Sequence, residues 1–251
     1  TGKGSEILEK IEGIEFNGKK LKVRYFDQYG SETPRPDYSV SDDVTAESVI
    51  INYIKSIGGA EKLKSVSSIE IKAKANLQGT VLEMYSLKNN QNQSLMTMTA
   101  MGMTLVKSVF NKYQGFNEVN GQRIPLSDEE LEQAIINSAL FSELNFDLGS
   151  IELVGTSVVN EEKAYEIKIT DNKSVFYSAE TGLKLKEFES QEVDGNLITG
   201  EVFYKEYKEV DGILIPSEIN QVSASIPVPG GLTFKTSIIK LNVKTSDSDF
   251  N

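Results

Sequence analysis

Apolar residues recur with two different periods along the chain. In residues 45–57 they return every three or four positions, which is the spacing of one face of a helix. The residues of this apolar stripe are Val49, Ile50, Tyr53, Ile54 and Ile57. Thr45 is a favoured N-cap residue, and Gly58-Gly59 is a typical stop. The pattern therefore predicts a helix with one buried face.

From residue 67 onward the period becomes two. In the segment 67–77, SSIEIKAKANL, apolar residues alternate with Glu, Lys and Asn, which predicts a strand with one buried face. Similar segments, separated by Gly, Asn and Asp, follow at 80–88, 93–100, 103–111, 113–119, 122–126, 150–159, 162–170, 173–179, 183–193, 197–209, 213–225 and 232–244. Most of the links are too short for a parallel crossover, so neighbouring strands should pair antiparallel.

One helical pattern, over 128–140, interrupts the strands. Ser127 and Glu130 have the spacing of a capping box, and Leu131, Ile135 and Leu140 fall toward an apolar surface. A sheet of about eleven strands rarely stays open without curling. We therefore predict an α+β fold: a large curved antiparallel sheet of about eleven strands, a half-barrel, with this helix covering or plugging its concave face.

Residues 1–44 differ in character from the rest. The pattern predicts a helix over 5–13 and a strand over 21–30, and then 31–44 contains two prolines and has no apolar period. The predicted organisation is a short segment 1–30, a linker 31–44 and a domain over 45–251. The start, TGKG, does not resemble a natural beginning, so we expect a segment upstream of it.

Composition narrows the functional classes. The 251 residues have a formal net charge of −11 and include no His, Cys or Trp. The acidic balance argues against a nucleic-acid partner. Without His and Cys the usual triads and zinc ligands cannot form. We therefore expect no catalytic residue, no metal and no cofactor. No apolar run reaches the length of a transmembrane helix, so no membrane-spanning segment is expected.

The charged residues have a simple structural interpretation. Asp42-Asp43 and the acidic run 128–130 stand at predicted helix starts, where negative charge is favourable. A second, mixed group occupies neighbouring predicted strands and predicts a solvated sheet face with cross-strand pairs. A binding face is the alternative for this group. Its members are Lys184, Lys186, Glu187, Glu189, Glu192, Lys205, Glu206, Lys208 and Glu209.

The methionines suggest a candidate ligand site. All five lie within residues 84–103; Met96 and Met98 share a strand face, and Met84 lies on the preceding strand. A flexible, polarisable lining suits an adaptable hydrophobic pocket. The predicted cavity lining is Met84, Met96 and Met98 from the sheet with Leu131 and Ile135 from the helix. The alternative is ordinary core filling beneath the helix.

Three phrases resemble the periplasmic outer-membrane lipoprotein-sorting proteins (LolA/LolB-like). They are the turn Glu180-Thr181-Gly182, the turn Asp211-Gly212 followed by Pro216, and the closing Asp247-Ser248-Asp249-Phe250. The order of helix, strands, helix and strands is also similar to that family. The resemblance covers about 45–251. It implies a curved sheet that binds acyl chains under a helix. It also implies a location in the periplasm or at the outer membrane of a Gram-negative cell envelope.

The segments GKGSEILEKIEG (2–13) and LKVRYFDQYG (21–30) resemble the closing helix and strand of insulinase-like (pitrilysin-type) zinc peptidases. In that family the zinc motif H-x-x-E-H lies on an upstream domain. This chain has no histidine, so no catalytic residue is carried over. The resemblance implies that the chain is the non-catalytic C-terminal region of a zinc peptidase, with the upstream peptidase domain as a possible partner.

Three functional hypotheses follow. The leading one is a non-catalytic domain that binds a lipid or an acylated lipoprotein in its cavity. The second is a structural accessory domain of the peptidase, with a filled core and no ligand. The third, an enzyme, requires a cluster of carboxylate, Lys and Tyr side chains that is not visible in the sequence.

Overall fold

The computed structural model describes residues 39–193, 196–224, 226 and 228–251, with the short pieces 14–16, 19–20, 22, 25–26 and 32–33. The helix predicted over 5–13 lies outside the described residues. Two short hairpins are described before the main domain. They are β1 (Glu15–Phe16) with β2 (Lys19–Lys20), and β3 (Tyr25–Phe26) with β4 (Glu32–Thr33). The strand predicted over 21–30 is therefore described only at β3.

Helix α2 (Ala46–Ser56) begins and ends where the pattern predicts. Thr45 and Ser48 form a reciprocal capping box, and Gly58 and Gly59 both adopt positive φ after the last turn. The short helix α3 (Ala60–Lys64) follows directly. Helix α4 (Asp128–Ser138) has the predicted Ser127–Glu130 capping box, and two 3-10 turns, η1 (Ser142–Asn145) and η2 (Asp247–Phe250), complete the helical elements of the described residues. Among those residues, no helix is long and apolar enough to cross a membrane.

The strands form one antiparallel sheet that does not close into a barrel. Its order is β10-β9-β8-β7-β6-β5-β17-β16-β15-β14-β13-β12-β11, which is 13 strands rather than about eleven. The bounds are β5 (Ser68–Leu77), β6 (Thr80–Asn89), β7 (Gln93–Ala100), β8 (Met103–Asn111), β9 (Gly115–Val119), β10 (Gln122–Pro125), β11 (Glu152–Val159), β12 (Glu162–Thr170), β13 (Lys173–Ser178), β14 (Lys184–Val193), β15 (Asn196–Val210), β16 (Ile213–Ser223) and β17 (Leu232–Leu241). The last strand of this sheet in chain order, β17, pairs with the first one, β5, and this pairing joins two meanders.

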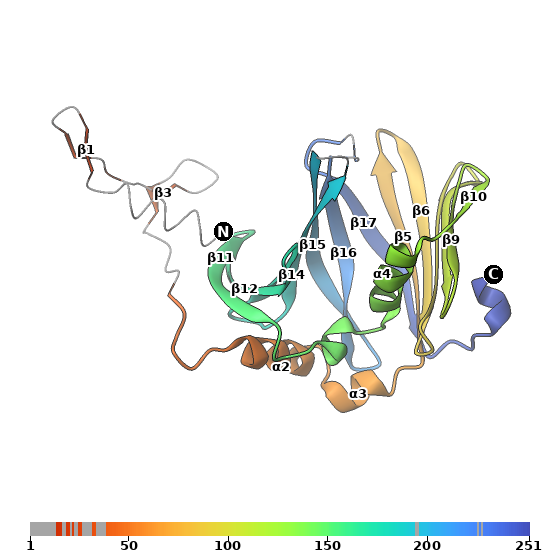
Figure 1. Cartoon of the computed structure of the whole chain (residues 1–251), viewed down its shortest axis with the longest axis horizontal. Coiled ribbons are helices and arrows are strands. Elements are labelled where there is room, and N and C mark those ends of the chain that lie inside the picture. The colour runs from red at the N-terminus through yellow and green to blue at the C-terminus, as the bar shows by residue number, and fades with distance from the viewer. Residues whose placement is uncertain are drawn as a thin grey trace.

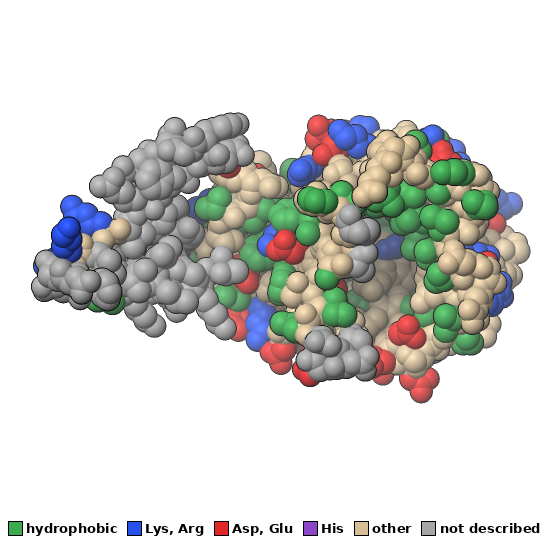
Figure 2. Space-filling view, turned by 90° about the horizontal axis from the view of Figure 1, so that it is seen from above, with side chains coloured by type: hydrophobic (Ala, Val, Ile, Leu, Met, Phe, Trp, Pro, Cys, Tyr) green, Lys and Arg blue, Asp and Glu red, His purple; other side chains and the backbone are tan. Residues whose placement is uncertain are grey.

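The sheet curves around α4, as predicted. In Figure 1 the two meanders face each other across a gap, α4 lies within the curve, and α2 and α3 lie across one end. Figure 2 shows the molecule from above the view of Figure 1. Between the two halves of the sheet its surface is hollowed, with hydrophobic side chains around the hollow. The α+β half-barrel with a helix on its concave side is thereby confirmed.

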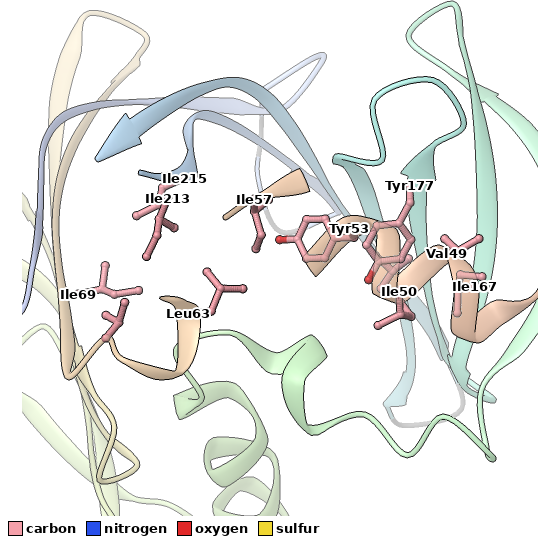
Figure 3. Packing of buried hydrophobic residues seen from close by; sticks show 12 residues of the cluster. Val49, Ile50, Tyr53, Ile57, Leu63, Ile69, Ile167, Tyr177, Ile213 and Ile215 are labelled. Atoms are coloured by element: carbon pink, nitrogen blue, oxygen red, sulfur yellow. The ribbon is translucent and has the colours of Figure 1, made fainter. Parts of the chain in front are cut away.

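The main core lies between α2 and the sheet. Figure 3 shows Ile50 and Tyr53 of α2 lying toward Ile167 and Tyr177, while Ile57 lies toward Ile213 and Ile215. The predicted stripe of α2 is the face that is buried. The Tyr53 and Tyr177 rings pack at 5.1 Å between centroids. This core fixes one end of the half-barrel.

The two family-like phrases near the C-terminus have structural roles. Pro216 lies in β16 beyond the stretch that pairs with β17, so that side of the strand is locally an edge, as proline requires. Phe250, in η2, is fully buried with Leu87 and Val109 on the outer face of the sheet. The tail therefore covers the convex side and leaves the concave side to α4.

Candidate ligand cavity

A cavity of about 560 Å³ lies on the concave face, between the two halves of the sheet. Its walls are β5 and β6 on one side and β12–β16 on the other, and the end of α4 with the loop through η1 covers it. Its apolar lining consists of Ile57, Ile69, Ile71, Ile136, Leu140, Phe141, Phe146, Ile169, Val175, Leu214, Ile215, Pro216 and Ile219. This volume is within the usual range for pockets that hold small molecules.

One wall of the cavity carries buried charge. The Lys184 ammonium nitrogen lies 2.6 Å from Oε1 of Glu143 and 2.8 Å from Oε1 of Glu187. Lys184 is only 8% exposed and Glu143 only 4%. Lys173 approaches the other oxygen of Glu187 at 3.6 Å. We call this group, together with Lys88 described below, the ionic end of the cavity.

Tyrosines surround the ion pairs and add hydrogen bonds to Glu143, to Glu187 and to the main chain of Lys184. The Tyr177 hydroxyl donates to Glu143 Oε1 at 3.3 Å, and the Tyr207 hydroxyl donates to the Lys184 carbonyl at 2.7 Å. The Tyr204 hydroxyl hydrogen-bonds Glu187, and its ring centroid lies 5.2 Å from the Lys184 nitrogen. Buried charges require such a shell because an unpaired one is costly.

These contacts stabilise the ionised forms of Glu187 and Lys184. Burial alone would raise the pKa of Glu187, but Lys184 and Lys173 outweigh it and lower that pKa to about 2. Burial would lower the pKa of Lys184, but Glu143 and Glu187 hold it well above its ordinary value. The structure thus brings together the carboxylate, Lys and Tyr side chains that the enzyme hypothesis required. A general acid or base works best with a pKa near the working pH, so Lys184 and Glu187 form an ion pair rather than an acid–base pair.

The inward orientation of Lys184 overturns the prediction of a solvated face for this residue and for Glu187. Strict alternation would place Lys184 with Lys186, away from Glu187. A β-bulge makes Leu185 an extra residue, so that Tyr177 pairs with Lys184 while Phe176 pairs with Lys186. The bulge turns Lys184 to the face of Glu187. Lys186 stays on the opposite face, paired with Glu201 at 2.5 Å, and Lys205, Lys208 and Glu209 are exposed as predicted.

Lys88 reaches the cavity from the facing wall. It is half-buried on β6, between Ser86 and the end of the strand, and its ammonium donates to the Asn137 carbonyl of α4 at 2.6 Å. Burial lowers the pKa of Lys88, and Lys184 lowers it further. Sequence alternation places Lys88 on the concave face, but nothing in the sequence places it near Lys184.

The predicted methionine lining lies on the correct face but outside the lining of this cavity. Met84 pairs with Met98, and Met96 pairs with Ser86, which is a lining residue, so all three methionines face inward. Met84 and Met98 are partly buried and pack against a buried apolar cluster, and we call the whole group the methionine end. Its other members are Leu77, Ala73, Ala75, Leu82, Ala100, Leu105, Ile226, Leu232 and Phe234. A role for the methionines in ligand binding stays a prediction.

Helix α4 presents a different face to the cavity from the one the sequence favours. Its more buried residues are Leu131, Ala134 and Ser138, whereas Gln133, Ile136 and Asn137 line the cavity. Ile135 is 46% exposed and lies outside the lining. Ligand contact by Leu131 and Ile135 likewise stays a prediction. The helix covers the concave face, and Ile136, rather than Ile135, is its isoleucine that lines the cavity.

Two solved structures have this architecture over nearly their whole length. A LolA superfamily protein from Nitrosomonas europaea matches with a TM-score of 0.52 and 15% identity, over 83% of this chain and 98% of that one. The chain has a LolA-like fold. A DUF1329 family protein from Desulfovibrio piger matches with a TM-score of 0.51 and 14% identity, over 82% and 97%. No protein-family model and no curated protein matches the sequence.

A shared LolA-like fold at this identity says nothing about the chemistry of the cavity. That chemistry follows from the side chains described above. Isoleucines and phenylalanines offer burial of apolar surface, and the ionic end offers charged hydrogen-bond donors and acceptors in the same space. The arrangement suits an elongated molecule with an apolar part and a polar part.

Proposed function

We propose that the chain is a non-catalytic domain that binds a hydrophobic ligand, a lipid or the acyl chain of a lipoprotein, in its curved-sheet cavity. The observation that carries the proposal is the cavity of about 560 Å³ with its predominantly apolar lining under α4. The LolA-like fold supports it, and so does the resemblance of the sequence phrases to lipoprotein-sorting proteins.

The expected affinity follows from burial. Each methylene removed from water contributes about 0.8 kcal/mol, so about ten of them contribute about 8 kcal/mol. Immobilising the ligand offsets part of this gain. About 8 kcal/mol alone corresponds to about 1 μM, so a dissociation constant of tens of micromolar or weaker is expected for a single chain.

The proposal is tested by filling the cavity. Ser86 points into it from β6 beside Ile71, so Ser86→Trp places a large ring in the ligand's space. Titration with a fluorescent fatty acid should show saturable binding by the native chain and a loss of at least about tenfold in Ser86→Trp. Native mass spectrometry of the purified protein should show a co-purified lipid that the variant lacks.

Ser237→Trp is the matched control. Ser237 is exposed on β17, and its hydroxyl donates to the Lys72 carbonyl at 3.1 Å. This variant should bind the probe as the native chain does. Binding that is absent from the native chain, or equal in Ser86→Trp and the native chain, would refute the proposal.

The second candidate is a structural accessory domain with a filled core. The methionine end favours it, because Met84 and Met98 pack there against a buried apolar cluster rather than lining the cavity. Such a domain would bind no probe and would co-purify with a protein partner whose affinity is unchanged by lipid.

The cellular context forms a separate part of the proposal. The resemblance of residues 1–30 to the end of insulinase-like zinc peptidases supports a place downstream of a peptidase domain. The sorting-protein resemblance supports the periplasm or the outer membrane. The gene's upstream sequence tests both: an H-x-x-E-H motif and a signal peptide are expected, and the absence of the motif would contradict the peptidase context.

A further inference from the structure

Three lysines converge on the cavity from opposite walls. Lys88 comes from β6, Lys173 from β13 and Lys184 from β14, and all three are lining residues. Lys184 and Lys173 are close enough to Lys88 to lower its pKa by repulsion, while Glu187 raises it. Lysine side chains from both walls of the half-barrel therefore face the same cavity.

The two glutamates at this end pair with Lys184 and Lys173, and neither lies at ion-pair distance from Lys88 among the described residues. Glu143 and Glu187 are both engaged by Lys184, and Glu187 also faces Lys173. The other acids of the lining, Asp147 and Glu189, are exposed. Within the part of the chain that the structure describes, Lys88 has no carboxylate at ion-pair distance, and its hydrogen-bond partner is the Asn137 carbonyl. The lining as a whole holds three lysines and four acidic residues, so the missing counter-ion is local to Lys88.

A half-buried ammonium without a counter-ion is unfavourable, since water is withdrawn and no opposite charge replaces it. An anion entering the cavity would supply that charge. Charge-assisted hydrogen bonds between ammonium and carboxylate or phosphate oxygens are stronger than neutral ones. The cavity has an apolar wall directly beside the lysine, because Lys88 pairs across the strands with Ile69, and Ser86 with Ile71.

We propose that the ligand of this cavity is an anionic amphiphile, whose carboxylate or phosphate head is held by Lys88 and whose hydrocarbon chain lies along Ile69 and Ile71. This inference rests on the proposed function and specifies the ligand class. Lys88 contacts the head directly. Lys173 and Lys184 remain paired with the glutamates and attract the anionic head electrostatically without contacting it.

Lys88 also has a structural role that the experiment must separate. The last turn of α4 carries no basic residue of its own, and the Lys88 ammonium complements the negative end of that helix at Asn137. A purely structural lysine would affect stability and the binding of every ligand alike. A head-group contact would affect only charged ligands, so selectivity distinguishes the two roles.

The experiment is calorimetric titration of the full chain with three ligands of equal chain length: dodecanoate, dodecyl phosphate and dodecanol. The native chain should bind at least one of the two anions about tenfold more tightly than the alcohol, the value expected for one charge-assisted hydrogen bond. Comparison of the two anions tells a fatty-acid-like head from a phospholipid-like one.

Lys88→Met should abolish the preference for the anions over dodecanol, whatever it does to dodecanol affinity itself, whereas Lys88→Arg should retain the preference. Lys205→Met, at an exposed lysine of β15, is the matched control and should behave as the native chain does.

Equal affinity of the native chain for anions and alcohol overturns the inference while leaving the proposed function intact. So does an equal loss for all three ligands in Lys88→Met. Failure of every ligand to bind the native chain refutes the proposed function itself. If Lys88→Met does not fold, the native selectivity and the Lys88→Arg arm still decide.

Discussion

The ionic end and the methionine end occupy the same concave face, yet they are built in opposite ways. At the methionine end, Met84 and Met98 pair across the strands and pack against a buried cluster of small, branched and aromatic side chains. At the ionic end, Lys184 draws Glu143 and Glu187 together, and an open space of about 560 Å³ remains in front of them.

The difference shows how side-chain chemistry decides where a curved sheet stays hollow. Flexible methionines adapt their shape and fill gaps. Charged groups need fixed partners and a shell of hydrogen bonds, which Tyr177, Tyr204 and Tyr207 provide, so they cannot collapse onto the facing wall. One end of the half-barrel is therefore core, and the other end is a candidate binding site.

Removing the central lysine should have the largest effect. In Lys184→Met the buried Glu143 loses its counter-ion, and we expect a loss of about 3–5 kcal/mol in the free energy of unfolding. Urea unfolding measures it. Adding Glu143→Gln to Lys184→Met should recover part of the loss, because the unpaired charge is then gone.

The control for this prediction is Lys205→Met, which should change the free energy of unfolding by less than about 0.5 kcal/mol. A Lys184→Met protein as stable as this control would contradict the account of the ionic end as a fixed, buried ion-pair network.

Acid should weaken the ionic end before it affects the methionine end. The pKa of Glu187 is about 2 in the folded chain against an ordinary value of 4.5. The stabilisation from this carboxylate is full above about pH 4.5 and is lost as the pH falls toward 2, and the difference corresponds to roughly 3 kcal/mol in total. About 2 kcal/mol of this stabilisation should be lost by about pH 3.

Urea unfolding from about pH 6 to about pH 3 measures this loss, and Glu187→Gln should flatten the dependence by that amount. Glu209→Gln, at an exposed position on β15, should leave the dependence unchanged. The same pH dependence in Glu187→Gln and the native chain would show that the lysines do not hold the Glu187 charge.

The smallest expected effects separate stability from binding. Met98→Ala leaves a void in the packed methionine end and should cost about 2 kcal/mol of unfolding free energy, with unchanged ligand affinity. Ile71→Ala, at the cavity wall, should cost about 1 kcal/mol but weaken dodecanoate binding several-fold. Urea unfolding and calorimetry measure the two quantities. Weaker binding in Met98→Ala than in Ile71→Ala would reverse the assignment of the two ends.

Most of the fold could be predicted from the sequence because it depends on local periodicity. The stripe of α2, the capping box of α4, and the alternation and turn residues of the strands all act within a few residues. The order of the strands in the sheet is harder to predict from the sequence. The pairing of β17 with β5, which joins the two meanders, connects residues far apart in the chain.

The candidate site was predicted less well, for two physical reasons. A single extra residue, Leu185, reverses the face of Lys184, and such a bulge has no clear signal in the sequence. The second reason is that Glu143, on a 3-10 turn, meets Lys184 only through the tertiary fold. The methionines share the face of Ser86, but spacing alone does not tell whether a ligand would meet them, so their role stays a prediction.

The most direct test uses the absence of native tryptophan from the chain. A single Trp introduced at Phe141, beside the ionic end, or at Met98, in the methionine end, would be the only Trp signal in each variant. Titration with a brominated fatty acid quenches a Trp that the ligand touches. The account predicts quenching in Phe141→Trp and little in Met98→Trp. Quenching in Met98→Trp alone, or in neither variant, would contradict it.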